Sequence, residues 1–432
     1  MLPEAVFASV FPEQVVAPIR QMIKRARFVM GRVTAVDPKE REIACDTLAG
    51  VVTQRYEHLV LAFRNRARLD LLPGLAEHGI PLKTVGDAMH IRNTVLRRVA
   101  RIELEADPAM RRRLGQFVVI GGGFSGVETA GELVDCLRGI RRYYPRVRPD
   151  ELSVTLIQDQ SRLLLELSER MGRAAHASLS SRGVRVRVNT RARCIGERGV
   201  MLATGEFIAA ATVISTIGMR PNPLVERMSL PTERGRIVVN PDLSVTDTPG
   251  IWAVGDCALV RNAFDDKMAP TTAQFAVREA RLAAVNILAM LESRPTRAFR
   301  YRPLGTMAAI GHRRGVAEVL GLRISGLPAW LLWRAYYLSQ MPTLERKVRI
   351  FVAERHHPPA LHAKPGPRPT GRRGIPRSHG PATVVPSRGC AIFGKLTARP
   401  CVLIGMATAV GHDRCAVGSG TRRGRSDDRS GG

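Results

Sequence analysis

Apolar and polar positions alternate in short patches along the first 110 residues, and the spacing predicts a mixture of helices and strands. A period near 3.6 residues indicates a helix, whereas short apolar or alternating runs indicate strands. The predicted elements are a helix over Glu13–Arg27, strands over Arg27–Val33, Glu42–Asp46 and Tyr56–Ala62, and a helix over Leu82–Ala109 capped by Thr84 or Asp87.

The clearest pattern follows, between residues 115 and 229, where apolar strands alternate with helices. In chain order it predicts a strand over Gln116–Ile120, a helix over Val127–Leu137, a strand over Leu152–Ile157, a helix over Ser168–Ser181 and a strand over Val184–Val188. This β-α-β-α-β order is typical of a parallel sheet that binds a dinucleotide. The sequence therefore predicts an α/β protein.

The second half of the chain is less regular, and its character changes after Val352. It predicts strands over Arg236–Val239 and Ile251–Val254, a helix from about Thr271 to Leu291, and then two short strands with a tryptophan-rich helix before residue 352. Residues 353–432 hold one Phe, no Trp and no Tyr, among many Pro, Gly, Arg and Ser. This composition predicts a disordered tail.

A glycine-rich turn joins the first strand and helix of the clearest region. Gly121, Gly123 and Gly126 have the G-x-G-x-x-G spacing. The first glycine permits a tight turn, the second leaves room for a pyrophosphate, and the third lets the helix lie close to the strand. The phosphate then meets free N–H groups at the positive end of the helix. We expect these three glycines to bind a dinucleotide.

Three polar residues near this turn bear on which dinucleotide is bound. Gln158 ends the second strand, where a side chain can bind the adenine ribose hydroxyls. Its amide can hydrogen-bond a hydroxyl, which favours NADH over NADPH, but it has no charge to repel a 2′-phosphate, so both stay open. Arg162 and Arg182 either bind a phosphate or are solvated.

Glu128 lies in the first turns of the same helix, four residues before Glu132 and on the same face. Its carboxylate either reaches toward the nicotinamide ring or is a surface group stabilised by the helix dipole.

Composition narrows the possible chemistry. The 432 residues are 45% hydrophobic and have a formal net charge of +28, which favours anionic partners or reflects arginine-rich codon usage. None of the seven cysteines forms a C-x-x-C or C-x4-C pair, so neither a redox-active dithiol nor a thiolate metal site is expected. We expect no metal, no secretory signal and no membrane-spanning segment.

A second constellation lies beyond residue 214. Residues 215–222 read STIGMRPN and include Gly218, and residues 250–258 read GIWAVGDCA, with Gly255 and Asp256 at the end of a strand. The carboxyl ends of strands are where α/β sheets bind ligands. Together with the glycine turn, this order resembles the two-dinucleotide FAD/NAD(P)-binding flavoproteins. The resemblance implies that Asp256 contacts the ribityl and pyrophosphate end of FAD.

The segment APTTAQFAVREA narrows the resemblance to type II NADH dehydrogenases, the NADH:quinone oxidoreductases, over roughly residues 2–352. In that family Ala273 and Gln274 would lie by the isoalloxazine ring and the quinone headgroup. The implied fold is a Rossmann-like NAD(P)-binding domain (113–229) inserted in an FAD-binding domain (1–112 and 230–294). A membrane-associating region (295–352) and the tail (353–432) follow. The implied reaction passes hydride from NADH to FAD, and electrons then reach a quinone.

The sequence departs from the family pattern in three places. No glycine-rich unit precedes Gly121, so the FAD domain should lack its first βαβ unit and central strand, as if truncated. Phe63 and Arg64 replace a glycine-containing turn, which should put bulk and charge against the flavin. The tail resembles translation in a shifted frame. A soluble NAD(P)H-dependent flavoprotein reductase with another acceptor and a non-catalytic NAD(H)-binding remnant are therefore alternative functions.

Aromatic and basic residues gather between 326 and 352. Trp330, Trp333, Tyr336 and Tyr337 share one helical segment, and four basic residues lie within or shortly after it. Such a helix suits an anionic membrane surface, and the expected location is peripheral, on the cytoplasmic face. The alternative is a helix packed on its own domain or on a second copy in a homodimer. The basic tail has too few aromatic residues for us to expect specific nucleic-acid binding.

Overall fold

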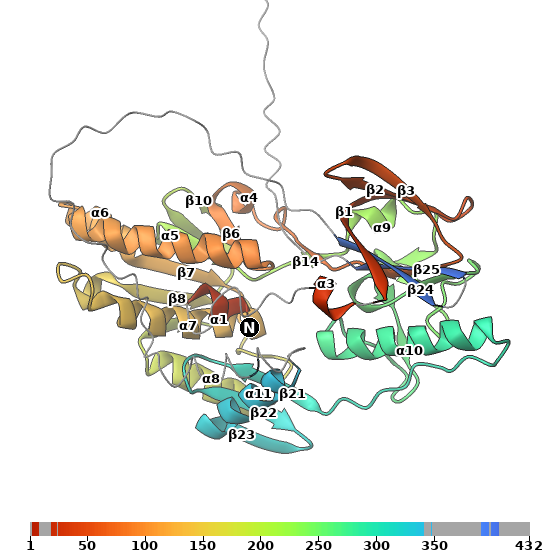
Figure 1. Ribbon diagram of the computed structural model, residues 1–432. Helices are drawn as coiled ribbons and strands as arrows, with labels where there is room; N and C mark the ends of the chain where they lie inside the picture. Colours follow the sequence, from red (N-terminus) through yellow and green to blue (C-terminus); the bar gives the residue numbers. More distant parts are fainter. Residues whose placement is uncertain are drawn as a thin grey trace, which may run out of the picture.

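The computed structural model describes residues 2–7, 19–23, 25–340, 347, 390–396 and 399–405. It has two lobes, each built around one large sheet, with a smaller sheet and helix α11 below the first lobe (Figure 1). The first lobe contains the five-stranded sheet and the second contains the seven-stranded sheet. The predicted α/β class is confirmed.

The sheet of the first lobe is entirely parallel, in the order β6-β13-β7-β8-β9. Its strands are β6 (Gly79–Pro81), β7 (Gln116–Ile120), β8 (Ser153–Ile157), β9 (Val184–Arg187) and β13 (Thr212–Ser215). Because both faces of this sheet are covered, β7 is buried along its whole length. The predicted strand over 116–120 has the observed bounds.

Helices cover one face of this sheet and a strand meander covers the other. Phe117 and Val119 pack into a core with α5 and α7, whereas Val118 and Ile120 face the meander. The covering helices are α5 (Val85–Leu104), α6 (Pro108–Gly115), α7 (Phe124–Arg141) and α8 (Glu169–Ser180), whereas the short α4 (Leu75–His78) packs on the face of the meander. The meander is β10 (Ala192–Gly196), β11 (Gly199–Leu202) and β12 (Phe207–Ala209).

The second lobe holds a mixed sheet in the order β17-β4-β25-β24-β1-β2-β3. Its strands are β1 (Ala26–Asp37), β2 (Glu42–Thr47), β3 (Gly50–Arg55), β4 (His58–Ala62), β17 (Ile251–Ala253), β24 (Cys390–Leu396) and β25 (Arg399–Gly405). The strands β17, β4 and β25 are parallel, and every other pairing is antiparallel. Buried β4 and β17 pack against α10 (Ala273–Leu291) in one core.

The strands β24 and β25 are ordered parts of residues 353–432, which the sequence predicted to be largely disordered. They form an antiparallel hairpin in the middle of the sheet, with β25 beside β4 and β24 beside β1. Buried β4 needs a partner on each side for its backbone N–H and C=O groups, and the hairpin provides one of them. The polar average over 80 residues conceals the two apolar runs, CAIF and CVLI. The rest of the tail lies outside the described residues.

Short elements link the lobes and extend them. The short strands β5 and β14 pair with each other where the chain passes between the lobes. Strand β5 follows β4 of the second lobe, and β14 follows β13 of the first. The remaining short elements are α3 (Ile19–Met22), β5 (Arg66–Ala67), β14 (Met219–Arg220), α9 (Pro223–Glu226), β15 (Thr232–Glu233), β16 (Arg236–Val238), β18 (Ala258–Leu259), β19 (Arg261–Asn262) and β20 (Lys267–Met268).

The region after α10 forms a three-stranded antiparallel sheet under a helix. It contains β21 (Gly305–Ala309), β22 (Gly315–Val319), β23 (Leu322–Gly326) and α11 (Leu327–Ser339). Three strands form where the sequence predicted two. The N-terminal helix α1 (Leu2–Val6) packs against α5 and α7, far in sequence from both. Of the predicted helix over 13–27, residues 13–18 and 24 lie outside the described residues, α3 (Ile19–Met22) forms part of it, and strand β1 begins at Ala26.

Candidate dinucleotide and flavin sites

The glycine turn sits at the carboxyl end of β7, as the sequence predicted. Gly121 has φ +113° and donates its N–H to the Ile157 carbonyl at 2.9 Å. A Cβ at Gly126 would lie 1.7 Å from the Gly121 carbonyl oxygen, so only glycine lets α7 start this close to the strand. A Cβ at Gly123 would meet nothing nearer than a Glu166 carboxylate oxygen at 3.9 Å. The turn therefore leaves open space beside Gly123, at the N-terminus of α7, where a pyrophosphate fits.

Gln158 reaches this turn from the end of β8. Its Oε1 accepts the Gly122 N–H at 2.8 Å, and the side chain is buried. The predicted ribose contact remains a prediction, because this hydrogen bond orients Gln158 toward the loop.

The two arginines near Gln158 have structural partners instead of the predicted phosphate or solvent. Arg162 donates to the Leu164, Leu165 and Leu167 carbonyls. Arg182 is buried and pairs with Asp135 at 2.8 Å. Both guanidinium groups donate to carbonyl or carboxylate oxygens. Because buried oxygens need such partners, the two arginines serve the fold instead of a phosphate or solvent.

Glu128 lies on α7 where that helix meets β21, and its Oε1 accepts the Ala309 N–H at 3.3 Å. Glu128 is half-buried; burial raises its pKa to about 7, and the nearby Glu4 carboxylate adds to this. Both alternatives for its role stay predictions. A carboxyl group that titrates near neutral pH suits proton exchange. Its proximity to a nicotinamide ring stays a prediction.

Gly255 and Asp256 follow β17 in the second lobe, at the carboxyl end of its parallel strands. Gly255 has φ +70° and donates its N–H to the Glu279 carboxylate at 2.7 Å. The Asp256 carboxylate accepts the Asn65 N–H at 3.0 Å. Burial raises the pKa of Glu279 to about 7, and the charge of Asp256 contributes in the same direction. Sequence reasoning missed Glu279 and Asn65, although Glu279 stands within the quoted segment APTTAQFAVREA.

Phe63 does not obstruct this site, contrary to the prediction from the sequence. It is fully buried in the second lobe's core with Leu61 and Val254. Arg64 is exposed, and the backbone of Asn65 faces Asp256 instead. Alternation along an extended segment turns the bulky ring to the core and so keeps the site open.

Ala273 and Gln274 begin α10 near the same edge. The Gln274 side-chain oxygen accepts the Tyr301 hydroxyl at 3.3 Å, and the Arg278 guanidinium stacks 4.1 Å from the Tyr301 ring centre. Gln274 is therefore held at the start of the helix. Tyr301 and Arg278 were not predicted, because their pairing joins segments that no local spacing connects. Gln274 and Glu128 belong to separate clusters, with no hydrogen bond between them in the described structure.

A hollow of about 500 Å³ lies beside Asp256's partner Asn65. Segments that connect the two lobes and the segment before α10 form its walls. The lining residues are Asn65, Met219, Pro221, Arg234, Arg236, Met268, Ala269, Pro270 and Thr271. Gly218 precedes this wall at φ +71° and packs on Leu71 and Arg68. The hollow is large enough for a ring system, and two arginines favour an anion.

These residues fit the ring and ribityl end of a flavin nucleotide, on three observations. Asp256 stands at the strand end, Gly255 adopts a left-handed turn, and the hollow opens beside Asn65, whose N–H binds Asp256. On the side of β4 away from β17 the neighbouring strand is β25, and the residues after Gly405 lie outside the described part.

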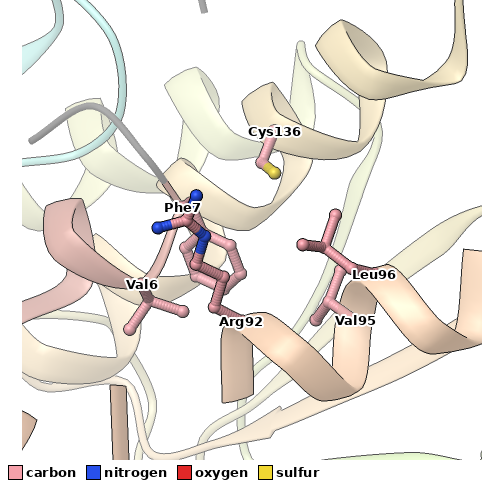
Figure 2. A pocket seen from close by; sticks show the side chains of 6 residues that line it. All are labelled: Val6, Phe7, Arg92, Val95, Leu96 and Cys136. Carbon is pink, nitrogen blue, oxygen red and sulfur yellow. The ribbon is translucent and has the colours of Figure 1, made fainter. Parts of the chain in front are cut away.

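The cysteines of the described residues lie outside any disulfide. Cys45, Cys136 and Cys257 are buried, and burial raises the pKa of Cys136 and of Cys257 to about 12. Figure 2 shows Cys136 at a small crevice where Phe7 of the N-terminal segment faces α5 and α7. No cluster of His, Cys, Asp or Glu that could hold a metal occurs in the described ranges. Likewise, none of the helices described there is long and apolar enough to cross a membrane.

Two nucleotide-type sites at the carboxyl ends of two sheets define a two-dinucleotide oxidoreductase. Residues 2–280 match the family model described as pyridine nucleotide-disulphide oxidoreductase. The chain belongs to this family. It is 32% identical to demethylphylloquinone reductase NdbB of Synechocystis over 331 residues, 75% of this chain and 76% of that protein. It is 28% identical to the type II NADH:quinone oxidoreductase NdhA of Mycobacterium tuberculosis, over 81% of this chain and 77% of that protein.

The fold also matches a solved structure. The NDH2 of Plasmodium falciparum, solved in complex with NADH, superposes with a TM-score of 0.74 at 15% identity, over 81% of this chain and 89% of that chain. This likeness confirms the fold alone. The relatives named above confirm the resemblance to type II enzymes that the sequence predicted.

Proposed function

We propose that this protein is an NADH:quinone oxidoreductase, which takes hydride from NADH through bound FAD and delivers electrons to a quinone at a membrane surface. The family and the named relatives support this activity. The observation that carries it is the pair of strand-end sites, the glycine turn of the first lobe and Gly255–Asp256 of the second, with the hollow beside the latter.

On the NADH side, the chain's own groups bind and orient. The open space at Gly123 and the N-terminus of α7 receive the pyrophosphate, while Gly121 and Gly126 hold strand and helix together. Gln158 fixes the turn through Gly122. Glu128, whose pKa burial raises to about 7, can exchange a proton near neutral pH.

On the flavin side, Asp256 binds a ribityl hydroxyl, and Glu279 holds Gly255 in its turn. FAD supplies the chemistry, since it accepts a hydride and releases single electrons. Ala273 and Gln274 line the place where a quinone headgroup binds, and Tyr301 keeps the Gln274 amide oriented. Rate comes mainly from holding the partners close, because no nucleophilic side chain is required.

The test is to purify the full chain and measure bound flavin, NADH oxidation and quinone reduction. The proposal expects a yellow protein with about one FAD per chain and NADH oxidation that depends on added quinone. A colourless protein that still binds NADH would instead identify a non-catalytic NAD(H)-binding protein. A yellow protein that reduces soluble acceptors but no quinone would identify a reductase of another acceptor.

We also propose that the region including α11 contacts an anionic membrane on its cytoplasmic face. The structure changes which residues do so: Trp333 and Arg334 are buried, with Arg334 paired to Glu4 at 3.6 Å, so part of the aromatic face packs on its own domain. The exposed residues are leucines of α11 and of the β22–β23 turn, namely Leu320, Leu322, Leu327, Leu331 and Leu332. Exposed arginines accompany them, namely Arg313, Arg314 and Arg323.

This leucine edge, defined by those five residues, can be tested with vesicles. Replacing Leu320 and Leu322 by Glu should weaken sedimentation with vesicles of anionic phospholipid at least tenfold, because inserting each leucine is worth about 1.5–3 kcal/mol. The matched control is Leu48→Glu, since Leu48 is equally exposed, at 73%, but lies on the second lobe. If the wild-type protein is a dimer that does not sediment with vesicles, the leucine edge would instead be the contact between two copies in a homodimer.

A further inference from the structure

Lys83 lies in the first lobe, two residues after the edge strand β6 and two before α5. Its backbone N–H and that of Thr84 both donate to the Asp87 carboxylate, at 3.0 and 2.8 Å. Thr84 accepts the Asp87 N–H in return, which completes a capping box at the start of α5. The Asp87 carboxylate therefore binds two backbone N–H groups. These bonds fix the backbone of Lys83 and leave its ammonium group available for another partner.

The Lys83 ammonium group has a weak partner. It lies 2.9 Å from the Met219 sulfur, and a thioether is a poor hydrogen-bond acceptor. No other hydrogen-bond partner of this ammonium occurs in the described part of the chain. The group is half-buried, and this burial lowers the pKa of Lys83, while the charge of Asp256 acts in the opposite direction. A partly desolvated cation with so weak a partner is poised to bind an anion.

Met219 connects Lys83 to the hollow. Met219 forms part of its wall together with Asn65, whose N–H binds the Asp256 carboxylate. Ala269 and Thr271, from the segment before Gln274, form another part of the lining. The Lys83 ammonium group thus touches one lining residue of the hollow, and the charge of Asp256 acts on it.

We propose that Lys83 is a positioning residue whose ammonium group stabilises the negative charge that the flavin ring gains on reduction. This inference rests on the proposed function, since it requires FAD in the hollow. A positive charge beside the ring favours the reduced form because the added electrons increase negative charge on the pyrimidine side. Lys83 would therefore set how readily the flavin accepts the hydride.

The experiment compares FAD-loaded wild type with Lys83→Met, Lys83→Arg and Lys39→Met by sulfite titration. In this reaction the sulfite sulfur donates its lone pair to the flavin N5, an N–S bond forms, and the ring takes up the negative charge. No further oxidant or reductant is needed, and the loss of visible flavin absorbance reports binding. Lys39 lies in the β1–β2 turn and controls for the loss of one positive charge elsewhere.

Lys83→Met should weaken sulfite binding roughly tenfold, which is the effect expected of one partly screened charge at this range and corresponds to about 1.4 kcal/mol. The two-electron midpoint potential should fall by about 30 mV, the same tenfold change for a two-electron couple. Lys83→Arg should stay within about threefold of wild type, and Lys39→Met should match wild type, both with unchanged FAD content.

The outcomes separate the two proposals. A Lys83→Met protein that retains FAD, with unchanged sulfite affinity and potential, overturns the role of Lys83 and leaves the oxidoreductase intact. If Lys83→Met loses affinity for FAD or NADH but keeps the wild-type midpoint potential, the role of Lys83 is also overturned. Lys83 would then bind a phosphate of the nucleotide. A wild-type chain that binds no FAD contradicts both proposals together.

Discussion

The two lobes reach similar nucleotide-type sites by different routes. All strands of the first lobe's sheet come from residues 79–215, one continuous stretch. The second lobe's sheet combines residues 26–62 and 251–253 with the hairpin 390–405. Contacts that close such long loops are entropically more costly and form more slowly than local ones. We therefore expect the first lobe to tolerate disruption that the second lobe does not.

Deleting residues 353–432 should break this comparison most strongly. The deletion removes β24 and β25, which leaves β4 paired only with β17 and β1 paired only with β2. The second lobe should lose its cooperative unfolding, because a buried strand with unpaired backbone groups is costly. Hydrogen exchange should show loss of protection over residues 58–62 and retention over residues 116–120.

The matched control deletes only residues 406–432 and so keeps both strands. It should behave like the full chain. Unchanged protection of residues 58–62 in the larger deletion would mean that the hairpin does not complete the sheet.

The same contrast explains what the sequence could predict. Strand Gln116–Ile120, the cap Thr84 and the glycine turn follow from local spacing, and the structure has them where predicted. The hairpin within the tail was missed because strand pairing across more than 300 residues leaves no local pattern. The short β5 and β14 were missed because two-residue strands have no periodicity.

Within the first lobe, two alanine substitutions should separate folding from ligand binding. Gly126→Ala places a Cβ 1.7 Å from the Gly121 carbonyl oxygen, so the free energy of unfolding should fall by about 3 kcal/mol. Gly123→Ala meets only open space and should leave the unfolding midpoint unchanged. It should nevertheless weaken NADH binding about tenfold or more, because the methyl group occupies the pyrophosphate position.

Thermal unfolding and a fluorescence titration with NADH measure the two effects. Equal loss of stability in both variants would show that Gly123 serves packing, and full NADH affinity in Gly123→Ala would place the pyrophosphate elsewhere.

The lobes also differ in how they orient their turns, and pH should reveal this. Gln158, which cannot ionise, holds Gly122, whereas Glu279, with a pKa raised to about 7, holds Gly255. A carboxyl group whose pKa is higher in the folded than in the unfolded chain stabilises the fold fully below its unfolded value, near 4.5. That contribution is lost as the pH rises through about 7.

The free energy of unfolding of Glu279→Gln, relative to that of wild type, should therefore increase by on the order of 2 kcal/mol from pH 5 to pH 8. Glutamine can still accept the Gly255 N–H through its carbonyl oxygen. Urea unfolding at the two pH values measures the difference, with Glu226→Gln, on the exposed side of α9, as the control. A gap that does not change with pH would indicate that Glu279 stays ionised in the folded protein.

Side-chain roles at the sites were harder to predict than the turns that carry them. Sequence position placed Gln158, Asp256 and Gln274 at strand or helix ends, and the structure has them there. Their partners Gly122, Asn65 and Tyr301 could not be predicted, since each hydrogen bond joins distant segments. Likewise, the orientation of Phe63 and of Trp333 toward the core depends on packing that only the assembled fold determines.

The smallest effect is expected from Gln158→Glu, which tests whether the first lobe selects NADH. One carboxylate oxygen can keep the hydrogen bond from Gly122, and the other adds negative charge at the end of β8. That charge should repel a 2′-phosphate, so the ratio of kcat/KM for NADH over NADPH should rise about tenfold, or about 1.4 kcal/mol. Gln160→Glu adds the same charge at an exposed position two residues later and should change the ratio little. An unchanged ratio in Gln158→Glu would mean that this side chain serves only Gly122, and that the ribose is bound by other groups.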